Sequence, residues 1–170
     1  MANTYTKITT VSLSTTAANI DFSSIPATYT DLLIKISSRC DTASQDYFAL
    51  DIALNGSSAS FTTKQMFGVN ATAYYGSGAY RYVGYTQAVL MTANAFASGE
   101  IYIPNYANTS YVKSISADSV TETNAVGAVV AIHATTWSNT AAINQITLTP
   151  DAGGNFVAYT TATLYGINNS

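Results

Sequence analysis

Residues 137–167 limit the possible folds of this chain more than any other stretch. Ile146 and Leu148 alternate with polar residues, which is the period-two pattern of a strand with one buried face. A second alternating run follows at 156–165, and the Pro-Asp-Ala-Gly-Gly sequence at 150–154 contains the residues that turns favour. Two alternating runs joined by such a turn predict a β-hairpin.

The most regular alternation lies at residues 47–54, where every second residue is Phe, Leu or Ile. Asn55-Gly56 follows directly, and this dipeptide is the strongest short signal for a two-residue hairpin turn. Residues 61–69 are therefore predicted to be the strand that returns from this turn.

Further strands are predicted where apolar residues alternate or β-branched residues cluster. They lie at residues 4–14, 17–22, 31–40, 100–103 and 111–120. In the first of these strands the alternation slips between Ile8 and Val11, which predicts a bulge or a bend.

Two stretches fit both a strand and a helix. The apolar run within residues 86–99 is short enough for either, and we favour a buried strand. Residues 125–137 have some helical spacing, but Gly127 and several β-branched residues are poor helix formers. We predict a central strand there, buried on both faces.

The composition also favours an all-β protein. The chain has 25 Thr, 18 Ser and 13 Tyr, and only 9% of its residues are charged. Thr and Tyr fit the pleated surface of a sheet, whereas Ser favours turns. With eight to ten predicted strands separated by turns, we expect a single-domain β-sandwich over residues 1–170, with a jelly-roll-like arrangement.

Charge and hydropathy argue against nucleic acid and membrane as partners. The six Lys and Arg residues are scattered, and the net charge is -3, so no cluster could neutralise several phosphates. The longest apolar run, at 125–134, is far shorter than the roughly 20 residues of a membrane span. Cys40 is the only cysteine, which excludes an intrachain disulfide, and no signal peptide is recognisable, so we expect folding in a reducing cytoplasm.

No pattern in the sequence predicts a catalytic residue, a cofactor or a metal. His133 is the only histidine, and we expect it on a sheet face with one satisfied hydrogen bond, whereas Cys40 is expected to be a buried thiol at a strand end. The nine acidic residues are spread out, so a glycosidase pair is not indicated. Oxygen-rich loops at 41–46 and 151–155 lack the calcium-loop pattern, and turn formation explains them.

Residues 70–85 are unusual because tyrosines there interleave with glycines. Tyrosine offers a large amphipathic contact area and glycine lets a loop adapt, so binding surfaces often combine them. We predict an interface there, with packing at the sandwich edge and contact with glycans as the alternatives. The candidate interface residues are Tyr74, Tyr75, Tyr80, Arg81, Tyr82 and Tyr85.

Four sequence blocks, at 22–35, 100–106, 137–143 and 162–167, resemble a family of small β-rich bacteriophage virion proteins. Members of this family are known mostly from tailed phages of aquatic bacteria, as capsid decoration (cement) proteins or fibre-associated domains. The blocks are spread in order over most of the length of the chain, and none of them is a catalytic motif. The resemblance implies a structural part of a virus particle.

The first functional hypothesis is therefore a capsid decoration protein, made in the host cytoplasm and located on the outer surface of the phage head. It would bind the major capsid protein and stabilise contacts between capsid subunits. A homotrimer is expected by analogy with other decoration proteins. The alternative is a receptor-binding or fibre-tip domain that contacts host-surface glycans, and an enzyme acting on surface polysaccharide is a weaker third possibility.

Overall fold

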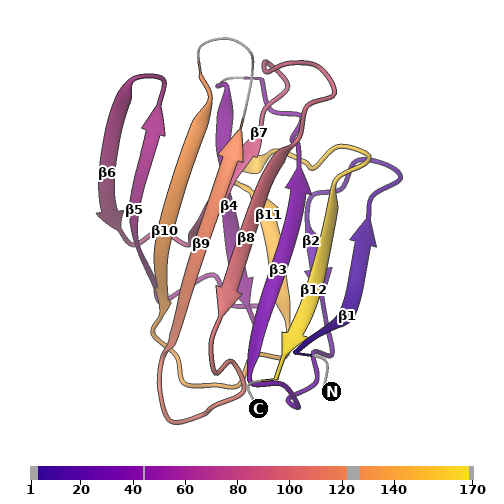
Figure 1. Ribbon diagram of the computed structural model, residues 1–170, viewed down its shortest axis with the longest axis vertical. Coiled ribbons are helices and arrows are strands. Elements are labelled where there is room, and N and C mark those ends of the chain that lie inside the picture. The colour runs from indigo at the N-terminus through magenta and orange to yellow at the C-terminus, as the bar shows by residue number, and fades with distance from the viewer. Residues whose placement is uncertain (1–3, 44, 122–126, 169–170) are drawn as a thin grey trace.

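The alternation of apolar and polar residues is realised as strands that form two antiparallel sheets packed face to face (Figure 1). The computed structural model describes residues 4–43, 45–121 and 127–168. Within them the elements are β1 (Tyr5–Ser12), β2 (Ile20–Phe22), β3 (Asp31–Ser38), β4 (Tyr47–Leu54), β5 (Phe61–Val69), β6 (Thr72–Gly78), β7 (Tyr82–Gln87), β8 (Ala97–Ile103), β9 (Lys113–Thr121), β10 (Val129–Trp137), β11 (Ile146–Pro150), the 3₁₀ turn η1 (Asp151–Gly153) and β12 (Thr161–Ile167). The expectation of an all-β sandwich is confirmed, although the described residues contain twelve strands rather than eight to ten.

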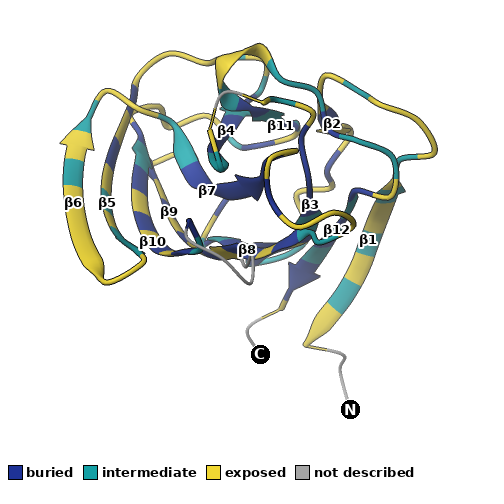
Figure 2. Cartoon of the chain, turned by 90° about the horizontal axis from the view of Figure 1, so that it is seen from above, coloured by how far each residue is buried: buried dark blue, intermediate teal, exposed yellow. Residues whose placement is uncertain are grey.

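The strand order is that of a jelly roll with two inserted hairpins. The larger sheet has the order β1-β12-β3-β8-β9-β10-β5-β6, and the smaller sheet has the order β2-β11-β4-β7. Without β5, β6, β9 and β10, the remaining eight strands alternate between the sheets as two Greek keys do in a jelly roll. The four inserted strands all join one side of the larger sheet, and this extension curls around β7 (Figure 2).

The core lies between the two sheets and is built from the inward positions of their strands. Leu32, Ile34 and Leu164 contribute from the larger sheet, while Ile52 and Leu148 contribute from the smaller one. All five side chains are fully buried, so both sheets share one hydrophobic cluster. At about 25 cal/mol per Å² of apolar surface removed from water, this burial is the main driving force for folding.

The predicted C-terminal hairpin is wrong, because its two strands belong to different sheets. β11 pairs with β2 and β4, whereas β12 pairs with β1 and β3. Residues 151–160 cross from one sheet to the other, and Phe156 in this connection is fully buried in the core. The turn residues at 150–154 therefore begin a crossover rather than a hairpin.

The predicted pairing across Asn55-Gly56 is also wrong, although the turn itself forms. Both residues have positive φ (51° and 75°), as a tight primed turn requires. Asn55 Oδ1 then accepts hydrogen bonds from the backbone N–H groups of Asn144 (2.9 Å) and Gln145 (3.2 Å). Because β11 and β7 already occupy both edges of β4, the strand that follows the turn, β5, joins the larger sheet instead.

Residues 88–96 form a loop, so the strand favoured within 86–99 is wrong beyond Gln87. The buried guanidinium of Arg39 organises this loop. Its Nη1 donates to the carbonyl oxygens of Thr92 (2.8 Å) and Ala95 (2.9 Å), and its Nη2 donates to those of Val89 (3.1 Å) and Met91 (3.2 Å). The loop carbonyls thus bind a cation rather than a neighbouring strand, which the local residue pattern cannot reveal.

Two smaller expectations have opposite outcomes. The predicted irregularity in the first strand is confirmed, since the register of β1 against β12 shifts between Lys7 and Thr9. The prediction that β10 is buried on both faces is wrong, because Val130 and Ile132 are each 63% exposed. β10 lies in the middle of the larger sheet, but only one of its faces meets the core.

Candidate functional site

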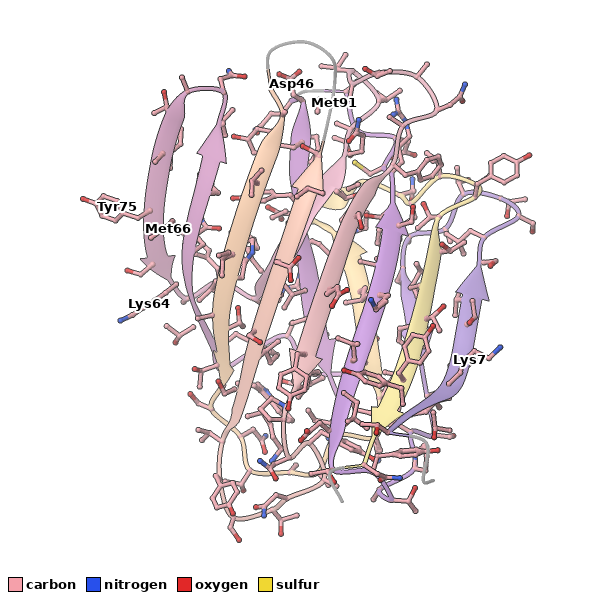
Figure 3. All side chains as sticks on the ribbon, in the orientation of Figure 1. Lys7, Asp46, Lys64, Met66, Tyr75 and Met91 are labelled. Atoms are coloured by element: carbon pink, nitrogen blue, oxygen red, sulfur yellow. The ribbon has the colours of Figure 1, made fainter. Side chains whose placement is uncertain are left out.

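The predicted tyrosines are divided between two surfaces because successive side chains in β6 point to opposite faces. Tyr75 is 90% exposed on the outer face of the larger sheet, where it lies opposite Met66 of β5 (Figure 3). Tyr74 points to the inner side of the curled extension and stacks on Phe67, with ring centroids 5.2 Å apart. The tyrosine-rich segment therefore does not form one continuous interface.

A β-bulge in β7 brings Tyr82 and Tyr85 to the same face. Ala49 of β4 pairs with Tyr85, and Asp51 pairs with Tyr82, so one residue of β4 lies opposite two residues of β7. Gly84, one of those two, has a φ of +150°. In a regular strand, the side chains of residues three apart point to opposite faces of the sheet. The extra residue of a bulge turns the side chains that follow it to the other face, so Tyr82 and Tyr85 point the same way. The alternation in the sequence could not predict this arrangement.

The two re-aimed tyrosines line a cleft of about 280 Å³ between the outer side of β4 and β7 and the inner side of the extension. We call it the aromatic cleft. Its lining residues are Gln45, Tyr47, Phe48, Ala49, Phe67, Tyr82, Tyr85, Asp151 and Ala152. Five of these side chains carry aromatic rings, which come from β4, β5 and β7, and the exposed lining of the cleft is more polar than apolar.

Ring contacts and hydrogen bonds hold the aromatic side chains in place. Tyr85 contacts Tyr47 edge to face at 5.2 Å and Phe67 at 5.5 Å between ring centroids. Tyr85 Oη donates to Gln65 Oε1 (3.1 Å), and burial raises the pKa of Tyr85. Tyr82 Oη donates to Asp151 Oδ2 (3.3 Å), and burial followed by the charge of Asp151 raises the pKa of Tyr82 to about 12.

A second cleft of about 320 Å³ adjoins the first, and the two share Asp151 and Ala152. We call it the polar cleft. Arg81 Nη2 and Asp51 Oδ2 form an ion pair of 2.6 Å at its wall, and Asp51 is buried. Burial raises the pKa of Asp51 to about 6, and Arg81 only partly opposes this shift. Asp51 Oδ1 has no hydrogen-bond partner among the described residues.

His133 lies behind the aromatic cleft, against Tyr85, with ring centroids 5.4 Å apart. The expectation that its ring has one satisfied hydrogen bond is wrong, because neither ring nitrogen has a partner among the described residues. The side chain is 1% exposed, and burial lowers its pKa to about 4. A neutral, buried imidazole that no acid orients is not arranged as a general base. Cys40 is a buried free thiol, and burial raises its pKa.

The outer face of the larger sheet carries a second candidate surface. Side chains that are apolar and exposed occupy neighbouring positions on four adjacent strands of the extension. We call this surface the apolar band; it consists of Met66, Tyr75, Val120, Val130 and Ile132. The register places Tyr75, Met66 and Ile132 side by side in one row across β6, β5 and β10. Val130 and Val120 lie opposite each other in the next row, on β10 and β9.

Beyond Ile132 the first row becomes charged. Asp118 of β9 follows Ile132, and Glu100 of β8 follows Asp118. Lys35 of β3 lies opposite Glu100 and forms an ion pair with it at 2.6 Å, where both side chains are solvent-exposed. The apolar band therefore ends at a charged border, as the rim of an interaction surface does.

Three of the six predicted residues line the clefts, namely Arg81, Tyr82 and Tyr85. Tyr74 supports the ring of Phe67, and Tyr75 lies on the opposite face. Tyr80 stacks on Tyr82 with ring centroids 4.9 Å apart. The sequence interpretation missed Asp51, Asp151 and Phe67, which lie on three different segments of the chain. Among these three residues, only Asp51 could have been noticed in the sequence, because it is an acid at an outward position of the most regular strand. Its proximity to the other two depends on the sheet topology.

Within residues 4–43, 45–121 and 127–168, no group of three or more His, Cys, Asp or Glu side chains is placed to hold a metal ion. Over the same residues, no helix has the length and apolarity needed to cross a membrane. Comparisons with models of protein families, with curated proteins and with solved structures find no match to this chain. The likeness to bacteriophage virion proteins thus depends on the four sequence blocks alone.

Proposed function

We propose that this protein is a capsid decoration protein that binds the outside of a phage head through the apolar band and stabilises contacts between major capsid subunits. The apolar band is the observation that supports this proposal. Its side chains are 45% to 90% exposed, and they stand together on one sheet face. Contiguous exposed apolar surface on a soluble protein marks a site of interaction with another macromolecule.

The shape of the surface fits this function. Three of the four strands of the band, β5, β9 and β10, are paired on both sides, so this sheet face is rigid and docking it costs little conformational entropy. A protein that binds only the mature lattice stabilises that lattice by mass action, and many copies add their effects. A homotrimer, seated where three capsid subunits meet, is the expected arrangement and rests on analogy with other decoration proteins.

The number of copies per particle tests this proposal. Gel densitometry of purified virions should give hundreds of copies of this chain per particle for a decoration protein. A few to a few dozen copies would assign it to a tail or fibre and would overturn the proposal.

Ile132→Glu should abolish the docking of the protein on heads that lack it. Ile132 is 63% exposed, so the substitution leaves folding nearly unchanged, but it puts an unpaired charge into the apolar band. A buried unpaired charge costs about 2–5 kcal/mol in binding, which weakens binding by about 30-fold or more. Sedimentation of the heads with bound protein measures this.

Leu90→Glu is the matched control, since Leu90 is 58% exposed and lies outside the band in the loop after β7. It should bind heads like the wild type. Equal binding by Ile132→Glu and the wild type would show that the band is not the docking surface.

A second candidate function, a receptor-binding domain that contacts host-surface glycans, is favoured by a different observation. The aromatic cleft lies on the other side of the extension from the apolar band, and it has the mixture of rings and polar groups that small-ligand sites have. The two functions use different surfaces and can be tested separately.

A further inference from the structure

We infer that the aromatic cleft and the polar cleft together bind an uncharged saccharide of one or two rings. This inference builds on the second candidate function and names its ligand class; it is independent of head binding through the apolar band. It follows from three properties of the site: fixed ring faces, hydrogen-bonding groups of both kinds, and the sign of the local charge.

The rings offer what the apolar face of a sugar needs. One face of a pyranose carries C–H groups with partial positive charge, and the face of an aromatic ring is electron-rich. Tyr82 is supported from behind by Tyr80, whose ring is nearly parallel to it (4°). Phe67 stacks on Tyr74 and also contacts Tyr85. Because neighbouring rings fix these side chains before a ligand arrives, little rotamer entropy is lost on binding.

The polar groups match hydroxyl groups, which both donate and accept hydrogen bonds. Asp151 presents carboxylate oxygens as acceptors, and the partly exposed Arg81 guanidinium presents donors. Asp51 Oδ1 has no hydrogen-bond partner among the described residues, but this atom is fully buried, so the acceptor oxygens that a ligand meets are those of Asp151. A sugar hydroxyl that donates to a carboxylate and accepts from Arg81 would bond to the acidic and the basic group of the site at the same time.

The charge of the site selects against acidic sugars. Among the residues that line the two clefts, the charged ones are Asp51, Asp151 and Arg81, so two negative groups face one positive group. Arg81 is already paired with Asp51. A carboxylate or sulfate on a ligand would therefore approach Asp151 without a free cation to receive it. An uncharged saccharide avoids this repulsion.

The size of the clefts limits the ligand. Volumes of about 280 and 320 Å³ are at the lower end of ligand pockets, which begin at roughly 300 Å³. Because the clefts meet at Asp151 and Ala152, one ring stacked in the aromatic cleft places a second ring beside the Asp51–Arg81 pair. A disaccharide thus spans both.

Ligand-observed NMR of the full chain with a panel of neutral disaccharides tests the inference, with lactose and its acidic derivative 3′-sialyllactose as one matched pair. We expect saturation transfer to at least one neutral disaccharide of the panel. For that disaccharide, Tyr82→Ala should weaken binding at least tenfold and Asp151→Asn several-fold. Tyr75→Ala, on the outer face of the same hairpin, should leave binding unchanged.

Asp151 lies on a partly exposed turn, and Asn at this position can still accept the hydrogen bond from the backbone N–H of Ala152. Asp151→Asn therefore tests the inference even if circular dichroism shows that Tyr82→Ala does not fold. The inference is overturned if no neutral disaccharide of the panel binds, if folded Tyr82→Ala or Asp151→Asn binds like the wild type, or if acidic sugars bind as tightly as their neutral counterparts. Head binding by the same preparations, which depends on Ile132, reports separately on the decoration function.

Discussion

Arg39→Met should destabilise the protein by about 4 kcal/mol and release the loop at 88–96. The Arg39 guanidinium is buried and donates four hydrogen bonds to carbonyl oxygens of this loop. Each intramolecular hydrogen bond contributes about 1 kcal/mol, and leaving a buried partner unsatisfied costs more. Urea denaturation measures the loss, and hydrogen exchange should show faster exchange confined to residues 88–96.

The Arg39→Lys variant tests whether stability depends on the shape of the guanidinium or only on its positive charge. An ammonium has three donors on one atom and cannot copy the planar fork that reaches four carbonyls, so we expect Lys to restore less than half of the loss. Lys64→Met, which removes an exposed cation from β5, is the control and should change stability by less than about 0.5 kcal/mol. An Arg39→Lys variant as stable as the wild type would show that only the charge matters at this position.

Asp51→Asn should make the stability of the protein rise with pH between about pH 4 and 6.5, by about 3 kcal/mol in total. This slope comes from His133, whose pKa is lowered from 6.5 to about 4 by burial. In this range the unfolded state binds a proton at His133 and the folded state does not, so stability is present above pH 6.5 and is lost as the pH falls through 4. One pKa unit corresponds to about 1.4 kcal/mol.

His133→Phe should show the opposite slope. Burial raises the pKa of Asp51 from 3.8 to about 6, despite the ion pair with Arg81. The folded state then holds a proton that the unfolded state releases, so stability is greatest below pH 4 and falls by about 3 kcal/mol as the pH rises through 6. The Phe ring loses no hydrogen bond to a described residue, because neither His133 nitrogen makes one.

In the wild type, the contributions of Asp51 and His133 oppose each other over the same pH range and nearly cancel. Urea denaturation of the wild type and both variants at half-unit intervals from pH 4 to 7 measures the three curves. Differences between variant and wild type remove the effects of other groups, including Asp151, which also faces Asp51. Parallel curves for all three proteins would contradict the assigned pKa shifts of Asp51 and His133.

For the candidate site, the sequence indicated the region but not the arrangement. The tyrosine–glycine segment was recognisable from composition, and two of its tyrosines, Tyr82 and Tyr85, line the aromatic cleft. The bulge opposite Leu50 decides that Tyr82 and Tyr85 share a face. Asp151 reaches Tyr82 because the crossover that follows β11 begins beside β4, next to β7, although the two residues are far apart along the chain. Such contacts depend on which segments meet in space.

For the fold, the residue pattern determined the strands and their buried faces, and the tertiary structure decided their partners. The strand at Tyr47–Leu54 has the predicted bounds, because alternation is a local property with a period of two. Neither predicted hairpin formed, since a turn such as Asn55-Gly56 sets the local chain direction but not the sheet that the next strand joins. That choice depends on burying Phe156 and closing both edges of β4, and only the complete core supplies the free energy for it.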